Sequence, residues 1–134
     1  MLSLPHIPSD AIFIPGNTAS SKNSKQWTGT RLIWSKLARE YRDNTAIFYS
    51  MYRLKFQASC KGKDKPLKVG FYFVRDSRRK FDFVNMVQTV QDIIVRAEWL
   101  PDDNMDEMVP VPVEVNGQVY HVDKENPGVY IMVL

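Results

Sequence analysis

The chain has 134 residues, of which 44% are hydrophobic, and this predicts a single domain over residues 1–134 with a core of its own. The net charge of +3 permits binding of a polyanion without requiring it. The single cysteine, Cys60, excludes an internal disulfide framework and a cysteine-rich zinc site. No apolar run approaches the roughly 20 residues that span a bilayer, and residues 1–10 lack the features of a secretory signal. We therefore expect a cytoplasmic protein with no membrane partner.

The first half of the chain predicts a strand, a polar loop and a helix. Residues 11–14 are apolar and end at Pro15-Gly16, which is typical of a strand that runs into a turn. Residues 17–29 are rich in Ser, Thr, Asn and Lys and predict a mobile loop of a length that is often functional. Ser35 can cap a helix that continues to about Ser59. The apolar face of this helix is expected to carry Leu37, Tyr41, Phe48, Tyr52 and Phe56.

A second helix is the clearest element of the sequence. It follows a predicted strand at residues 67–74, covers about residues 83–97, and ends before Pro101, because the residue ahead of a proline avoids helical geometry. Asp82 stands at the N-cap position, where its carboxylate can accept a backbone N–H. One side of the helix carries Phe83, Val87, Val90, Ile94 and Ala97.

The C-terminal third predicts strands. Asn116-Gly117, a strong signal for a type I′ turn, separates residues 108–115 from residues 118–122 and predicts a β-hairpin. A second turn at residues 126–128 precedes a last strand over residues 129–134. The complete order of elements indicates an α/β or α+β domain with a small mixed sheet and two main helices.

Two acidic signatures lie at the two ends of the second helix and are the main candidates for a site. Asp82 opens the helix, and Asp102-Asp103 follows it in a turn. Mg²⁺ prefers oxygen ligands, commonly one or two carboxylates completed by water and phosphate. The helix is about 21–23 Å long, so the turn must fold back, or a second subunit must contribute, before these groups can share an ion. The alternative interpretation is that Asp82 only caps the helix and that the acidic pair is a solvated turn.

Two basic segments are candidates for phosphate contact. One directly precedes the second helix, and its cations are Arg75, Arg78, Arg79 and Lys80. The other lies in the polar loop, where the candidates are Lys22, Asn23 and Lys25. Arginine can bind phosphate oxygens through two parallel hydrogen bonds, and cations beside an acidic site reduce its repulsion of an anionic substrate. A solvated surface segment and a flexible linker are the plainer interpretations of the two.

In this order and spacing, the residues resemble the RusA-type Holliday junction resolvases, which are small phage-associated endonucleases. Ile14-Pro15-Gly16 followed by Ser21-Lys22-Asn23 is similar to the N-terminal strand and basic loop of that family. The basic run before Asp82 and Asn85 is similar to its arginine-rich approach to an Asp-x-Asp-Asn helix entrance. Further similarities are Asp92 on the helix, the acidic pair Asp102-Asp103, and the closing turn Asn126-Pro127-Gly128-Val129.

The resemblance implies a homodimer that binds four-way DNA junctions during recombination and repair and nicks two strands with Mg²⁺, for which Mn²⁺ can substitute. Carried over by position, Asp82 and Asp103 would hold the metal, with Asp102 beside them. Asn85, Gln88 and Asp92 would support the site.

Two positions depart from the pattern of the family. Val84 stands in place of the second aspartate of Asp-x-Asp-Asn, and Gln88 in place of a helix lysine that could stabilise charge at the phosphate. A second hypothesis is therefore a non-cleaving protein that binds branched DNA on the same scaffold. A third is a protein-interaction domain whose basic face is merely solvated.

Overall fold

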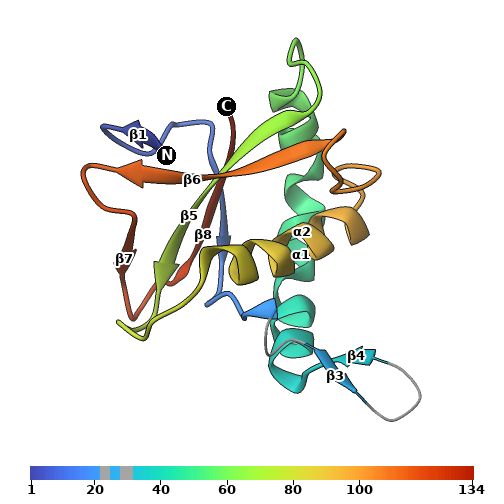
Figure 1. Ribbon diagram of the computed structural model, residues 1–134, viewed down its shortest axis with the longest axis vertical. Helices are drawn as coiled ribbons and strands as arrows, with labels where there is room; N and C mark the ends of the chain where they lie inside the picture. Colours follow the sequence, from blue (N-terminus) through green and yellow to red (C-terminus); the bar gives the residue numbers. More distant parts are fainter. Residues whose placement is uncertain (22–24, 28–31) are drawn as a thin grey trace.

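The computed structural model describes residues 1–21, 25–27 and 32–134, which form a small α+β domain with a mixed six-stranded sheet and two helices (Figure 1). This is the fold class that the sequence predicted. The helices are α1 (Lys36–Ser59) and α2 (Phe83–Arg96). The strands are β1 (Leu2–Leu4), β2 (Ile12–Pro15), β3 (Lys25–Trp27), β4 (Leu32–Trp34), β5 (Leu67–Arg75), β6 (Met108–Val115), β7 (Tyr120–Val122) and β8 (Gly128–Val133). Neither helix is both long and apolar enough to cross a membrane.

Strand β5 is the centre of the sheet, whose order is β1-β6-β5-β8-β2, with β7 also paired to β5. The predicted hairpin between residues 108–115 and 118–122 is wrong, because β6 and β7 both pair with β5 in parallel. The turn itself has the expected geometry, with positive φ at Asn116 and Gly117, but only one isolated antiparallel bridge joins its two sides. The long edge of β5 satisfies the backbone groups of both strands in succession, and this outweighs the local turn signal.

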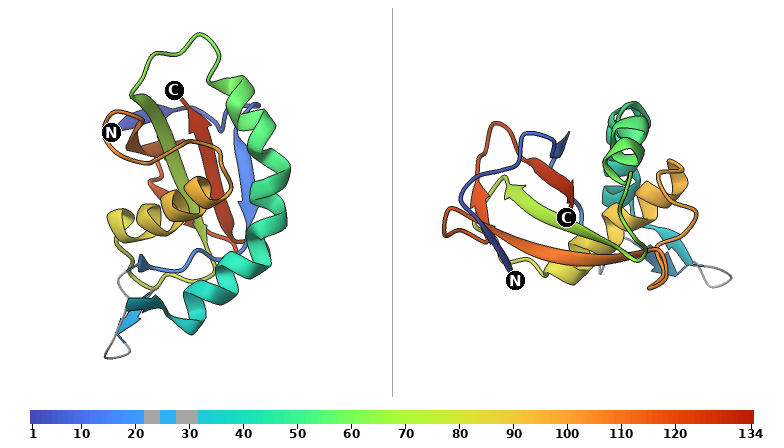
Figure 2. Two further views of the ribbon diagram at one scale, coloured as in Figure 1. Left: turned by 90° about the vertical axis from the view of Figure 1, so that its right-hand side faces the viewer. Right: turned by 90° about the horizontal axis from the view of Figure 1, so that it is seen from above.

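Both helices cover one face of the curved sheet (Figure 2). Alternate residues of β5 point to that face, so Val69, Phe71 and Phe73 join the main core, whereas Tyr72 and Val74 face a second, smaller core. Residues of the N-terminal segment pack against this smaller core on the other face. The central strand is therefore buried on both sides.

Helix α1 begins as predicted, since the Ser35 hydroxyl accepts a hydrogen bond from the Ala38 N–H at 3.3 Å. Its predicted apolar face is partly wrong, because Leu37 is 63% exposed. The buried residues are Ala38, Tyr41, Thr45, Tyr49 and Phe56, at successive spacings of three, four, four and seven. Thr45 can lie in this row because its hydroxyl donates to the Tyr41 carbonyl at 2.6 Å.

The predicted polar loop at residues 17–29 is also corrected in part. Strand β3 falls inside it and pairs antiparallel with β4, so the backbone forms a two-stranded sheet. The predicted DNA contacts Lys22 and Asn23 lie outside the described residues. Lys25 belongs to β3, but its side chain is also outside the described part of the structure.

Candidate functional site

A cleft of about 1290 Å³ opens in the described part of the chain. Four segments meet there: the loop after β2, the first turns of α1, the end of β5 with the basic run, and the entrance of α2. The turn between β7 and β8 adds Lys124. The lining residues that carry charge are Glu40, Arg75, Asp76, Arg79, Lys80, Asp82 and Lys124. The lining therefore carries four cationic and three anionic side chains, and the cations offer contacts to an anionic ligand.

Lys124 is a cleft residue that the sequence did not indicate. It lies about fifty positions from the basic run, and only the sheet register brings the two together: β7 pairs with β5 so that Val122 lies opposite Arg75. The next backbone N–H, that of Asp123, donates to the Arg75 carbonyl at 2.9 Å. No local motif around Lys124 could have revealed this position, because parallel pairing of distant strands decides it.

Arg75 was predicted to contact DNA, but it is only 9% exposed and its guanidinium is used inside the protein. It donates to the Thr18 carbonyl at 2.7 Å and stacks over the Phe81 ring at 5.0 Å. Burial lowers the pKa of Arg75, and the nearby Asp76 partly opposes that shift. Arg75 therefore fixes the loop after β2 as a wall of the cleft, while Arg78, Arg79 and Lys80 remain exposed.

Hydrogen bonds hold the uncharged wall of the cleft. The Tyr41 and Tyr49 hydroxyl groups are 2.9 Å apart in a buried hydrogen bond. Burial raises the pKa of both phenols, and either hydroxyl can be the donor of this hydrogen bond. The Asn17 side-chain oxygen accepts the Asp76 backbone N–H at 3.2 Å, which ties the loop after β2 to the basic run.

Asp82 stands at the N-cap position of α2, as predicted, but its side chain makes no capping hydrogen bond. The predicted role of this carboxylate as a helix cap is therefore wrong. The side chain is exposed and lines the cleft together with Asn85 and Met86. Its oxygen atoms are not used to close the helix end, so they are available to a ligand at the positive end of the helix.

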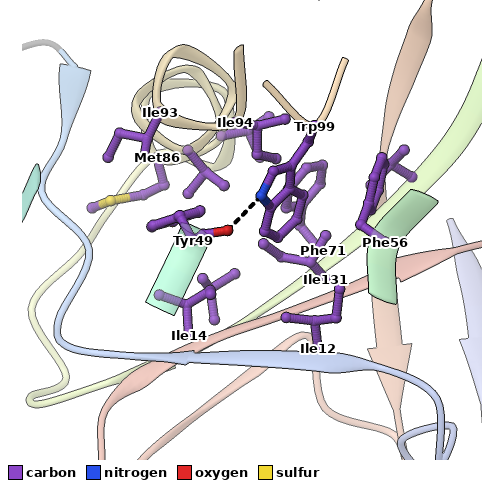
Figure 3. Close-up of a cluster of buried hydrophobic side chains, with 14 of the residues drawn as sticks. Ile12, Ile14, Tyr49, Phe56, Phe71, Met86, Ile93, Ile94, Trp99 and Ile131 are labelled. Atoms are coloured by element: carbon purple, nitrogen blue, oxygen red, sulfur yellow. Dashed lines mark hydrogen bonds between the residues drawn. The ribbon is translucent and has the colours of Figure 1, made fainter. Parts of the chain in front are cut away.

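The chain does fold back after α2, as a shared site would require. Trp99 anchors this return: it is 2% exposed, stacks on Phe56 at 4.9 Å, and donates from its indole nitrogen to the Tyr49 carbonyl at 2.7 Å (Figure 3). Asp103 then lies in a groove of about 380 Å³ along α2. The other residues of this groove are Phe83, Val84, Val87, Gln88, Gln91, Asp92 and Pro110.

The two aspartates of the acidic turn, Asp102 and Asp103, differ in their exposure and hydrogen bonds. Asp102 is fully exposed, and its two oxygens accept hydrogen bonds from the Asp103 N–H at 2.7 Å and the Asn104 amide at 3.1 Å. These bonds hold the pKa of Asp102 below its usual range. Partial burial, with a contribution from Asp102, raises the pKa of Asp103. Asp102 therefore shapes the turn, and Asp103 is the aspartate that faces the groove.

Asp82 and Asp103 line two different hollows: Asp82 lies in the cleft at the entrance of α2, and Asp103 lies in the groove that runs along α2 from Phe83 to Asp92. Among the residues that the structure describes, no three His, Cys, Asp or Glu side chains are grouped so that they could hold a metal ion. One described chain thus does not gather Asp82, Asp102 and Asp103 around a single ion. Gln88 has its side-chain oxygen bound by the Ser21 hydroxyl at 3.1 Å, which joins the loop after β2 to α2.

Comparison with known proteins was made for families and for curated proteins. No family model matches the chain, and no curated protein matches it.

Proposed function

We propose that the protein is a homodimeric, Mg²⁺-dependent endonuclease of the RusA type that cuts branched DNA in the cytoplasm, in recombination and repair. One observation carries the proposal: Asp82 lines the same cleft as the cations Arg79, Lys80 and Lys124, and Asp103 lines a groove along the same helix, α2. This juxtaposition of acids and cations suits a phosphodiester substrate.

The DNA backbone would lie along the cleft. Arg79, Lys80 and Lys124 line it, and Arg78 extends the same basic run on the surface. Cations placed this way neutralise phosphates and release counterions, so affinity should fall steeply with added salt. Phosphate contacts of this kind position a duplex without reading its sequence, which suits a protein that recognises the shape of a junction.

In one described chain Asp82 and Asp103 lie in separate hollows, so each would offer Mg²⁺ one carboxylate rather than a shared pair. Mg²⁺ usually takes one or two carboxylates, and water and substrate phosphate complete its coordination. Asp82 and Asp103 would supply the carboxylates, whereas Asp102 is engaged in its turn. The bound ion would lower the pKa of a water molecule and stabilise charge on the leaving oxygen, and Mn²⁺ can replace it.

A synthetic four-way junction tests the proposal against a linear duplex of the same sequence. The wild-type protein should nick the junction when Mg²⁺ or Mn²⁺ is added, and Asp82→Asn and Asp103→Asn should each slow nicking by about 100-fold or more. Asp106→Asn is the matched control, because Asp106 is an exposed aspartate of the same turn that lines neither hollow. Equal cleavage by wild type and Asp103→Asn would show that the site is misassigned.

A non-cleaving protein that binds branched DNA is the second candidate, and Val84 favours it. This valine is 69% exposed beside Asp103, at the position where the resemblance leads one to expect a carboxylate. The candidate predicts salt-sensitive junction binding without metal-stimulated nicking. Val84→Asp combined with Gln88→Lys should then create activity, and an inactive double variant would count against it.

A further inference from the structure

Strand β7 is held to the sheet by very little backbone. Its three residues, Tyr120–Val122, pair in parallel with the end of β5 and with no other strand in the described part of the chain. All three are only half-buried. Because so short a pairing is weak by itself, the position of β7 depends on the contacts of its side chains.

Tyr120 anchors β7 on the face of the sheet that the helices cover, since it lies opposite Phe73 in the register. Its ring meets Phe81 nearly at a right angle, with the ring centroids 4.9 Å apart. Phe81 directly follows the basic run, and its ring also contacts Phe73 at 6.0 Å and the Arg75 guanidinium at 5.0 Å. The Phe81 ring therefore joins the end of β5, the basic run and β7 in one cluster.

His121 anchors the same strand on the opposite face. Side chains alternate along a strand, so His121 points away from the face that carries Tyr120. Its Nδ1 shares a hydrogen bond of 2.9 Å with the Tyr72 hydroxyl, and the centroids of the two rings are 5.6 Å apart. Tyr72 is 2% exposed and belongs to the second, smaller core. Side chains thus hold β7 on both of its faces.

The turn after β7 is tied to this strand and carries Lys124. The Asp123 N–H donates to the Arg75 carbonyl at 2.9 Å. The side-chain oxygen of Asp123 accepts the N–H of Glu125 at 3.1 Å and that of Asn126 at 3.2 Å. Lys124 lies inside this turn and lines the cleft. Because the turn is closed by its own hydrogen bonds, a shift of β7 would shift Lys124 with it.

We propose that Tyr120 and His121 are positioning residues: they fix β7 from its two faces and so hold Lys124 at the cleft, where this lysine contacts a phosphate of bound DNA. The two residues act through Lys124 and not by touching the DNA. This inference deepens the proposed function and rests on its DNA-binding cleft. A lysine whose backbone is already fixed loses less conformational freedom on binding a phosphate, so loosening β7 weakens the contact although the lysine is still present.

Amide hydrogen exchange of the full chain without DNA tests whether these side chains hold the strand. Tyr120→Leu and His121→Leu should each speed exchange of the Asp123 amide by about ten-fold or more, while the amides of α2 exchange as in the wild type. Tyr120→Phe is the matched control, because it keeps the ring that contacts Phe81 and should exchange like the wild type. Circular dichroism verifies folding, and if one leucine variant does not fold, the other decides. Unchanged exchange of the Asp123 amide in a folded leucine variant overturns the proposal.

A double-mutant cycle of junction affinity, measured without Mg²⁺, tests whether Lys124 carries the effect. Lys124→Ala should weaken binding by about 5–10-fold and lower the slope of log affinity against log salt by about one. Tyr120→Leu should weaken binding by about 4-fold or more in the wild-type background, but by less than about 2-fold once Lys124 is alanine. Equal losses in the two backgrounds, or an unchanged affinity in Lys124→Ala, overturn the proposal.

Exchange and binding together separate this inference from the proposed function. A wild type that binds no junction refutes the proposed function and, with it, the DNA contact of Lys124. A wild type that binds the junction with an affinity that Tyr120→Leu leaves unchanged refutes only the positioning role.

Discussion

Replacing Trp99 by phenylalanine tests whether this indole holds the returning segment that carries Asp103 to α2. Phenylalanine keeps part of the stacking on Phe56 but loses the 2.7 Å hydrogen bond to the Tyr49 carbonyl. A buried hydrogen bond contributes about 1–1.5 kcal/mol, and the space left by the smaller ring costs about 1 kcal/mol more. We therefore expect Trp99→Phe to lower the free energy of unfolding by about 2–3 kcal/mol.

Urea unfolding followed by far-ultraviolet circular dichroism measures this change in free energy. In thermal unfolding the same change should lower the melting temperature by about 6–12 °C for a domain of this size. Met105→Ala is the control, because Met105 is 71% exposed in the same returning segment and its loss should cost less than about 0.5 kcal/mol. If Trp99→Phe unfolds like this control, the indole does not anchor the segment, and another contact places Asp103.

Four further substitutions separate structural from functional charges and test the sheet. Arg75→Met should lower the free energy of unfolding by about 2–3 kcal/mol, because it leaves the Thr18 carbonyl unpaired. Arg78→Ala should leave urea unfolding unchanged. It should reduce the slope of DNA affinity against salt concentration by about the amount that one phosphate contact contributes. Because the pKa of Asp103 is raised in the folded state, the folded protein loses stability as pH rises through the range just above the usual carboxyl value. Asp103→Asn should remove that loss. In melting curves the variant should be more stable than wild type near neutral pH and equally stable in strong acid. Gly128→Ala should destabilise by about 1–3 kcal/mol in urea, because an added Cβ would lie 2.5 Å from a backbone oxygen of β2.

Local patterns predicted the helices of this protein well. Ser35 caps α1 as expected, and α2 begins at Phe83 and buries Val87, Val90 and Ile94. Patterns with strong local causes, such as capping and a helical repeat of apolar residues, survive in the tertiary structure because the core uses the same faces. Leu37 was misplaced because the actual row in α1 contains the polar residue Thr45, whose hydroxyl is satisfied by its own helix.

Strand pairing was harder to predict from the sequence than the helices were. The turn at Asn116-Gly117 has the predicted backbone geometry, yet the strands beside it pair with β5 rather than with each other. Pairing depends on which distant edge is open, and a local window of sequence does not contain that information. The same long-range register placed Lys124 in the cleft and gave Arg75 a structural role, neither of which the basic run could reveal.

The sequence by itself determined the α+β class, the two helices, and the positions of the acids and cations, because helix periodicity, capping and turn chemistry act over a few residues. The tertiary structure alone decided that Trp99 anchors the segment after α2, that Asp82 and Asp103 line two different hollows beside that helix, and that Ile47 stays exposed on α1. These features join residues far apart in the chain, and only packing of the core brings such residues together.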